Sequence, residues 1–199
     1  MQEKYLGGVK MSIILKDIEK QVQEVLSFVK SEKNKMIDTD EIKKAVEKIS
    51  KTNIKVFSFS FKDKLDKAFI DCGAITQLSE GEISEYNIIL NSDKDVKYQR
   101  FSLVHEFGHI ILNAHNFEKG KFVASFHIDY DINHVDNSIS ELNTIFENEE
   151  KANIFALCVL MPKDEFIKCL FEYSIEKVAQ IFGVTERAAK SRFNLIRSN

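Results

Sequence analysis

The chain has 199 residues, of which 44% are hydrophobic and 30% are charged, and its formal net charge is -3 at pH 7. This composition predicts a soluble globular protein, and the slightly acidic charge argues against a general binder of nucleic acid or membrane surfaces. The three cysteines form no CxxC pair, and the longest apolar run, FALCVLM at 155–161, is too short to span a membrane. We therefore expect a cytoplasmic protein with neither a disulfide framework nor a membrane segment.

Apolar spacing in the first part of the chain predicts two helices and then a small sheet. The first helix is expected from Ser12 to about Lys30, and the second, with Thr39 or Asp40 as its cap, ends near Ser50. Alternation in NIKVFSFSF predicts a strand. Strands are predicted at 54–61, 68–78 and 86–91, and the last two are joined by the polar turn SEGE.

Two long helices are predicted in the second half of the chain. Asp93 or Asp95 can cap a helix from about Val96 to Ala114. Another runs from about Ile139 to Met161, where Pro162 stops it. The polar connection between these helices, through residue 140, shows no readable pattern of its own.

The stretch FSLVHEFGHIIL, residues 101–112, places two histidines and a glutamate inside an otherwise apolar helix. His105 and His109 are four residues apart, so both imidazoles project from one face and can bind one ion. Glu106 lies beside them, where its carboxylate can accept a proton from a water at that ion. The pattern is HExxH, which favours a zinc-dependent hydrolase over two histidines that are merely hydrogen-bonded in a core.

A catalytic zinc needs a third protein ligand, and the best source is ENEEKANIFALCVLMP. Glu149 and Asn153 share a helix face, so Glu149 can reach the ion while Asn153 accepts a hydrogen bond from His105. Glu150 is the rival ligand. Small residues at 152 and 156 would let this helix approach the first one closely at Gly108.

These two blocks, RFSLVHEFGHIIL at 100–112 and EEKANIFALCVLMP at 149–162, resemble the ImmA/IrrE metallopeptidases. The resemblance implies a thermolysin-like site with one zinc ion, in which His105, His109 and Glu149 are ligands and Glu106 is the base. Asn153 stands where some members carry aspartate. Members often cleave a helix-turn-helix repressor and so relieve repression, which makes such a repressor the expected partner here.

The connection and the tail offer further candidates. FHIDYDINHVDN fails as a calcium loop, because His134 stands in place of the required glycine. His115, His127, His134 or Tyr130 could stabilise the oxyanion of the reaction, although a surface role is the default for each. In the tail, two short helices around Gly183, with Thr185 as cap, form a helix-turn-helix shape. The basic residues that could contact DNA are Arg187, Lys190, Arg192 and Arg197.

The expected fold is α+β, with N-terminal helices, a small, mostly antiparallel sheet, two metal-bearing core helices and a helical tail. The expected domains are a zincin-like metallopeptidase over 1–165 and a small helix-turn-helix-like unit over 166–199. We expect a zinc endopeptidase that binds its substrate along the exposed sheet edge YNIILN. The alternative is a regulator that binds DNA or a repressor, or a toxin–antitoxin component, in which zinc only holds two helices together.

Overall fold

The computed structural model describes residues 4–29, 36–62, 74–78, 85–112, 122–125 and 140–198. Within these residues lie seven helices and one four-stranded sheet. The helices are α1 (Lys4–Phe28), α2 (Thr39–Ser50), α4 (Val96–Ile111), α5 (Ser140–Leu160), α6 (Lys163–Glu172), α7 (Ile175–Phe182) and α8 (Glu186–Arg197). The strands are β1 (Asn53–Phe59), β2 (Ala74–Leu78), β3 (Glu85–Asn91) and β4 (Phe122–Ser125). The expected α+β class is confirmed.

The sheet is mixed, with the strand order β1-β3-β2-β4. β1 runs parallel to β3, whereas β2 is antiparallel to both β3 and β4. The expectation that YNIILN forms an exposed edge is wrong, because β3 is paired on both sides. The alternation of the sequence could not reveal this, since pairing order depends on contacts distant in sequence.

One row of the sheet register faces the helices. Ile88 of β3 pairs with Val56 of β1 and with Thr76 of β2, and Thr76 pairs in turn with Val123 of β4. Ile88 and Thr76 are fully buried. Because alternate residues of a strand point to opposite faces, this row fixes the side of the sheet that packs on α4.

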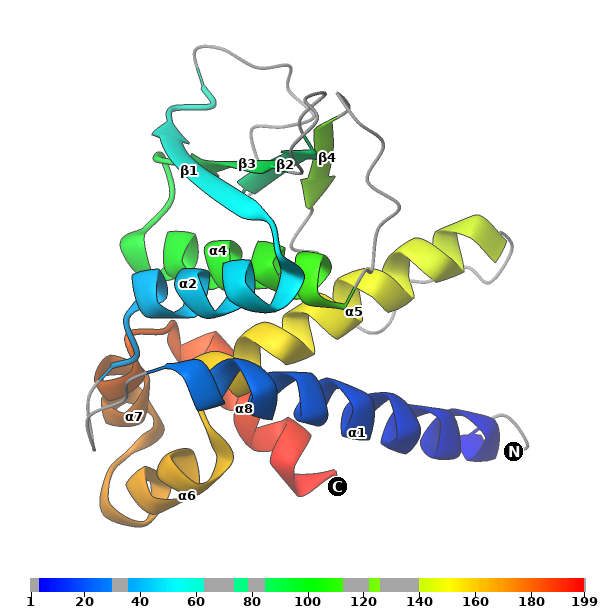
Figure 1. The fold of residues 1–199 in the computed structure, drawn as a ribbon. Helices are drawn as coiled ribbons and strands as arrows, with labels where there is room; N and C mark the ends of the chain where they lie inside the picture. Colours follow the sequence, from blue (N-terminus) through cyan, green and yellow to red (C-terminus); the bar gives the residue numbers. More distant parts are fainter. Residues whose placement is uncertain are drawn as a thin grey trace.

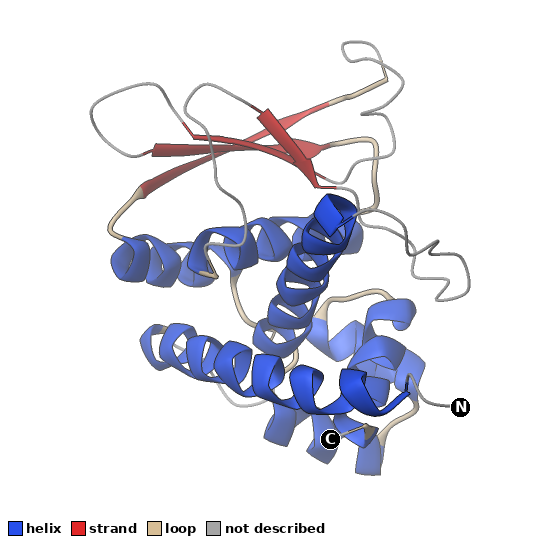
Figure 2. Cartoon of the chain, turned by 90° about the vertical axis from the view of Figure 1, so that its right-hand side faces the viewer, coloured by secondary structure: helices blue, strands red, loops and turns tan. Residues whose placement is uncertain are grey.

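The sheet forms one layer and the helices lie beneath it, as Figures 1 and 2 show. α4 contacts β2 and β3 on one side and α5 on another, while α2 lies beside α4. α1 packs on α5 and α2 through a buried stripe at helical spacing: Leu15, Ile18, Val22 and Val25. α4 is thus enclosed by other elements, which explains the length of its apolar sequence.

Several predicted boundaries need correction. α1 begins at Lys4 rather than at Ser12, and α4 ends at Ile111 rather than at Ala114. The cap of α2 is Asp38, whose carboxylate accepts a hydrogen bond from the backbone N–H of Asp40 at 2.9 Å. β4 and α6 were not predicted. β4 has only four residues, too few for alternation to stand out.

The tail forms the predicted pair of short helices. α7 ends at Phe182, and its C-cap Gly183 has φ of +63°, as expected for a glycine cap. Thr185 accepts a hydrogen bond from Ala188 N–H. Ala179 and Val184 are buried in the same apolar cluster as α1, α4 and α5. The division into domains at 165/166 stays a prediction. Among the described residues, no helix is both long and apolar enough to cross a membrane.

Candidate metal centre

The buried face of α4 supplies the first part of the site. The side chains of His105 and His109 are fully buried, and Glu106 is 1% exposed. The helix begins after its N-cap Asp95, one of the two predicted caps, whose carboxylate accepts a hydrogen bond from Lys97 N–H at 2.8 Å. The i, i+4 spacing stacks the two imidazoles edge to face, with ring centroids 4.6 Å apart.

α5 brings a carboxylate to the two imidazoles. Nε2 of His105 and Nε2 of His109 are 2.8 Å apart. Oε2 of Glu149 lies 3.1 Å from the first of these nitrogens, and Oε1 lies 3.3 Å from the second. The structure therefore brings together the two predicted histidines and the predicted third donor, although Glu149 is 44 positions from His105 in sequence.

Glu149 rather than Glu150 belongs to this group. Glu149 is 4% exposed, and its carboxylate is the one that meets the histidines. Glu150 is only partly buried, and burial raises the pKa of its carboxyl, with a further rise from nearby Glu147. The two neighbours therefore differ because adjacent residues of a helix point in different directions.

Asn153 fixes the orientation of one imidazole. Its Oδ1 lies 2.9 Å from Nδ1 of His105. An amide oxygen can only accept, so Nδ1 carries the proton and donates it. With the Nδ1 proton engaged by Asn153, Nε2 faces the space shared with His109 and Glu149, as in a metal-binding histidine.

A residue of the sheet, which the sequence did not reveal, forms a hydrogen bond with Glu106. Thr76 of β2 donates its hydroxyl to Oε2 of Glu106 at 2.7 Å, and both side chains are buried. The contact links positions 30 residues apart, and a threonine in a short strand gives no local signal of such a role. Its identification needed the sheet register that turns Thr76 toward α4.

Close packing of α4 and α5 makes the convergence possible. A Cβ added to Gly108 would lie 3.1 Å from Cα of Ala152, 3.1 Å from Cδ1 of Phe155 and 3.2 Å from the carbonyl oxygen of Ala152. Ala156 is fully buried on the same helix. The predicted approach of small residues is therefore confirmed.

The donors fit a divalent ion. One donor atom from each of His105, His109 and Glu149 lies within 4.8 Å of the others, and all three residues are buried. Tetrahedral zinc with bonds of about 2.0–2.1 Å sets ligand atoms about 3.3 Å apart, close to the observed 2.8, 3.1 and 3.3 Å. Two imidazoles and a carboxylate form a common donor set of catalytic zinc.

Other predicted residues lie elsewhere. His115, His127, Tyr130 and His134 fall outside the described residues, so an oxyanion role for any of them stays a prediction. Arg192 does not belong to an exposed basic face, because it is only 4% exposed. The other basic residues expected to contact DNA, Arg187, Lys190 and Arg197, are exposed, and contact with DNA stays a prediction.

Comparison with known families agrees with this geometry. Residues 49–194 match the peptidase M78 family, described as the IrrE N-terminal-like domain. No significant match was found among proteins with curated functions. The matched region includes all of the candidate centre, from Thr76 to Asn153. The chain belongs to this family: it carries a metallopeptidase domain with a candidate His-His-Glu metal site.

Proposed function

We propose that the chain is a cytoplasmic zinc endopeptidase that cleaves a helix-turn-helix transcriptional repressor and so relieves repression. The observation that supports this most strongly is the convergence of His105, His109 and Glu149 beside the buried carboxylate of Glu106. The HExxH pattern places a general base next to a metal in this way.

His105 and His109 would bind zinc through Nε2, and Glu149 would bind it through its carboxylate. When bound, zinc supplies Lewis-acid chemistry, which lowers the pKa of a coordinated water toward about 7 and polarises a carbonyl. Asn153 keeps the Nε2 lone pair of His105 directed at the ion by accepting the Nδ1 proton. Among the described residues, no fourth histidine, cysteine, aspartate or glutamate joins the group, which favours an open catalytic site over a closed structural one.

Glu106 is the proposed general base and acid. Its carboxylate takes a proton from the attacking water and delivers the proton to the nitrogen of the leaving amine. The hydroxyl of Thr76 holds Oε2, so the carboxylate keeps one orientation through both transfers. Thr76 is therefore a positioning residue, because it acts through Glu106.

The substrate would bind in extended form along β4. Among the strands that the structure describes, β4 is the last in the sheet order, and it pairs with β2, which supplies Thr76 to Glu106. A peptide added to the free side of an edge strand forms main-chain hydrogen bonds without the need for a particular sequence. β4 therefore replaces β3, which is an interior strand, as the proposed edge for substrate binding.

The repressor is proposed from the resemblance to the ImmA/IrrE peptidases. The test is incubation of the chain with any helix-turn-helix protein that is encoded next to its gene, followed by intact-mass analysis. Wild-type protein with zinc should produce two fragments. Neither Glu106→Gln nor chelated wild-type protein should do so.

Cleavage that persists in Glu106→Gln would reject Glu106 as the base. A repressor that binds tightly but is never cut would favour the non-enzymatic regulator instead. Thr76→Ser, which keeps the hydroxyl, serves as a matched variant with an intact base and should cleave.

A further inference from the structure

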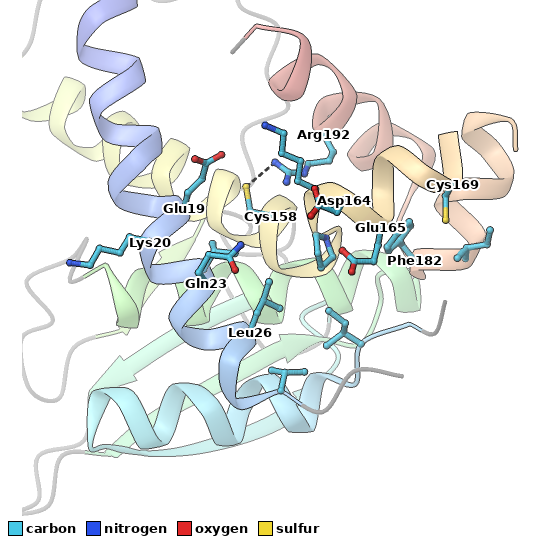
Figure 3. A pocket seen from close by; sticks show the side chains of 16 residues that line it. Glu19, Lys20, Gln23, Leu26, Cys158, Asp164, Glu165, Cys169, Phe182 and Arg192 are labelled. Atoms are coloured by element: carbon cyan, nitrogen blue, oxygen red, sulfur yellow. Dashed lines mark hydrogen bonds between the residues drawn. The ribbon is translucent and has the colours of Figure 1, made fainter. Parts of the chain in front are cut away.

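A cavity of about 580 Å³ lies among α1, α5, α6, α7 and α8 (Figure 3). Its volume is in the range of small-molecule sites. Apolar side chains of α1 and α7 line two sides of the cavity, among them Val22, Leu26 and Phe182. None of the residues assigned to the peptidase site contributes to its lining.

A buried guanidinium forms part of the wall. Arg192 of α8 donates from Nε to the carbonyl oxygen of Met161 at 3.0 Å and from Nη1 to Sγ of Cys158 at 2.9 Å. The second of these bonds is drawn in Figure 3. Within the described parts of the chain, these two are the hydrogen bonds of Arg192, and no carboxylate lies within ion-pair distance of it. Nη2 is therefore the guanidinium nitrogen that remains available to a ligand in the cavity.

The N-terminus of α6 adds positive potential to the same cavity. Pro162 is the N-cap of α6, it makes no side-chain capping hydrogen bond, and it lines the cavity with Lys163. Backbone N–H groups at a helix start carry partial positive charge. Asp164 and Glu165 in the first turn of α6 already offset part of this potential, so the guanidinium of Arg192 is the feature that favours a ligand with a negative group.

The remaining charges limit how negative that ligand can be. Three acidic side chains, Glu19, Asp164 and Glu165, line the cavity together with three basic ones, Lys20, Lys163 and Arg192. A dianion such as a phosphate monoester would be repelled by the acidic residues more strongly than a monoanion. The fork of an arginine suits a carboxylate, and the apolar wall suits a hydrocarbon body.

We propose that this cavity binds a small organic monocarboxylate with an apolar body, whose carboxylate pairs with Arg192. The ligand would join the tail helices to α1 and α5 by filling the space between them. This inference does not depend on the proposed peptidase activity, because no residue of the metal centre takes part.

The test is calorimetric titration of the full chain with hexanoate, octanoate and decanoate. The amide of each chain length has the same body without the charge, and the alkyl phosphate of each chain length supplies a dianion. At least one carboxylate should bind saturably with one site per chain. Its amide and its phosphate should bind at least ten-fold more weakly.

Two variants locate the site. Arg192→Met should abolish carboxylate binding, and Leu26→Trp should do so by filling the cavity without touching the guanidinium. Leu26 is only partly buried, so this second variant should keep the wild-type melting temperature and remains informative if Arg192→Met fails to fold. The proposal is overturned if none of the carboxylates binds, if amide and carboxylate bind equally, or if binding survives in a folded Leu26→Trp protein. Arg192 would then serve only to tie α8 to the end of α5.

Discussion

The spacing between α4 and α5 can be tested by adding one methyl group at Gly108. In Gly108→Ala the new Cβ would lie 3.1 Å from the backbone Cα of Ala152, which cannot rotate away, so the helices must separate by a few tenths of an ångström. Alanine favours a helix over glycine by about 1 kcal/mol. Overpacking costs about 1–3 kcal/mol, so the net loss of stability should be about 0–2 kcal/mol. This corresponds to a fall in melting temperature of at most about 8 °C for a chain of this size.

Zinc affinity should respond more than stability does. Glu149 is on α5 and both histidines are on α4, and metal sites tolerate errors of only about 0.2 Å in ligand distance. We expect the zinc Kd of Gly108→Ala to rise about ten-fold, equivalent to about 1.4 kcal/mol, and that of Gly108→Val to rise further. Val96→Ala, at a position of α4 that is 76% exposed, is the control and should leave the Kd unchanged. Competition with a fluorescent chelator measures these values. A Gly108→Ala protein that binds zinc like wild type and melts higher would refute the close packing as a requirement of the site.

Three further predictions concern single side chains. Thr76→Val should lower kcat about 10- to 100-fold with little change in KM, because a hydrogen bond to a charged group is worth about 1.5–3 kcal/mol. Thr76→Ser should restore most of the rate. Equal kcat values for both variants would remove Thr76 from the mechanism. Asn153→Leu should weaken zinc binding about 10- to 100-fold by chelator competition, through loss of the His105 contact, whereas an unchanged Kd would deny the orienting role. Burial raises the pKa of the Cys158 thiol to about 11. Peptide mapping should therefore find Cys158 unmodified by iodoacetamide at pH 8 and modified as the pH approaches 11. Rapid alkylation at pH 8 would contradict the buried position of the thiol.

The candidate centre was largely predictable because its signals are local. His105 and His109 share a face through helical spacing alone, and the same spacing relates Glu149 to Asn153. Two arguments were enough to predict that these two helix faces meet: zinc needs a third ligand, and small residues occur where the helices cross. The helical tail was predictable for a similar reason, since Gly183 and Thr185 mark a turn and a cap within a few residues.

The errors arose where long-range contacts decide the structure. β3 was predicted to be an edge strand because it lies directly upstream of the helix with the HExxH pattern, but its pairing with both β1 and β2 is set by strands that lie before it in sequence. Thr76 was missed because its role depends on that pairing. Arg192 was read as part of a basic surface, yet α8 turns it inward to the end of α5, where Met161 and Cys158 accept its hydrogen bonds. Helical spacing alone could have placed it with buried Ala188 and Ala189.

The most direct test of the central claim is the metal content and coordination of the purified chain. Native mass spectrometry with zinc in modest excess should find one ion per chain, and X-ray absorption should find two imidazoles with oxygen ligands and no sulfur. His109→Ala and Glu149→Ala should each lose the ion under the same conditions. A chain that stays free of zinc, or that keeps full zinc binding without Glu149, would contradict a site made by His105, His109 and Glu149.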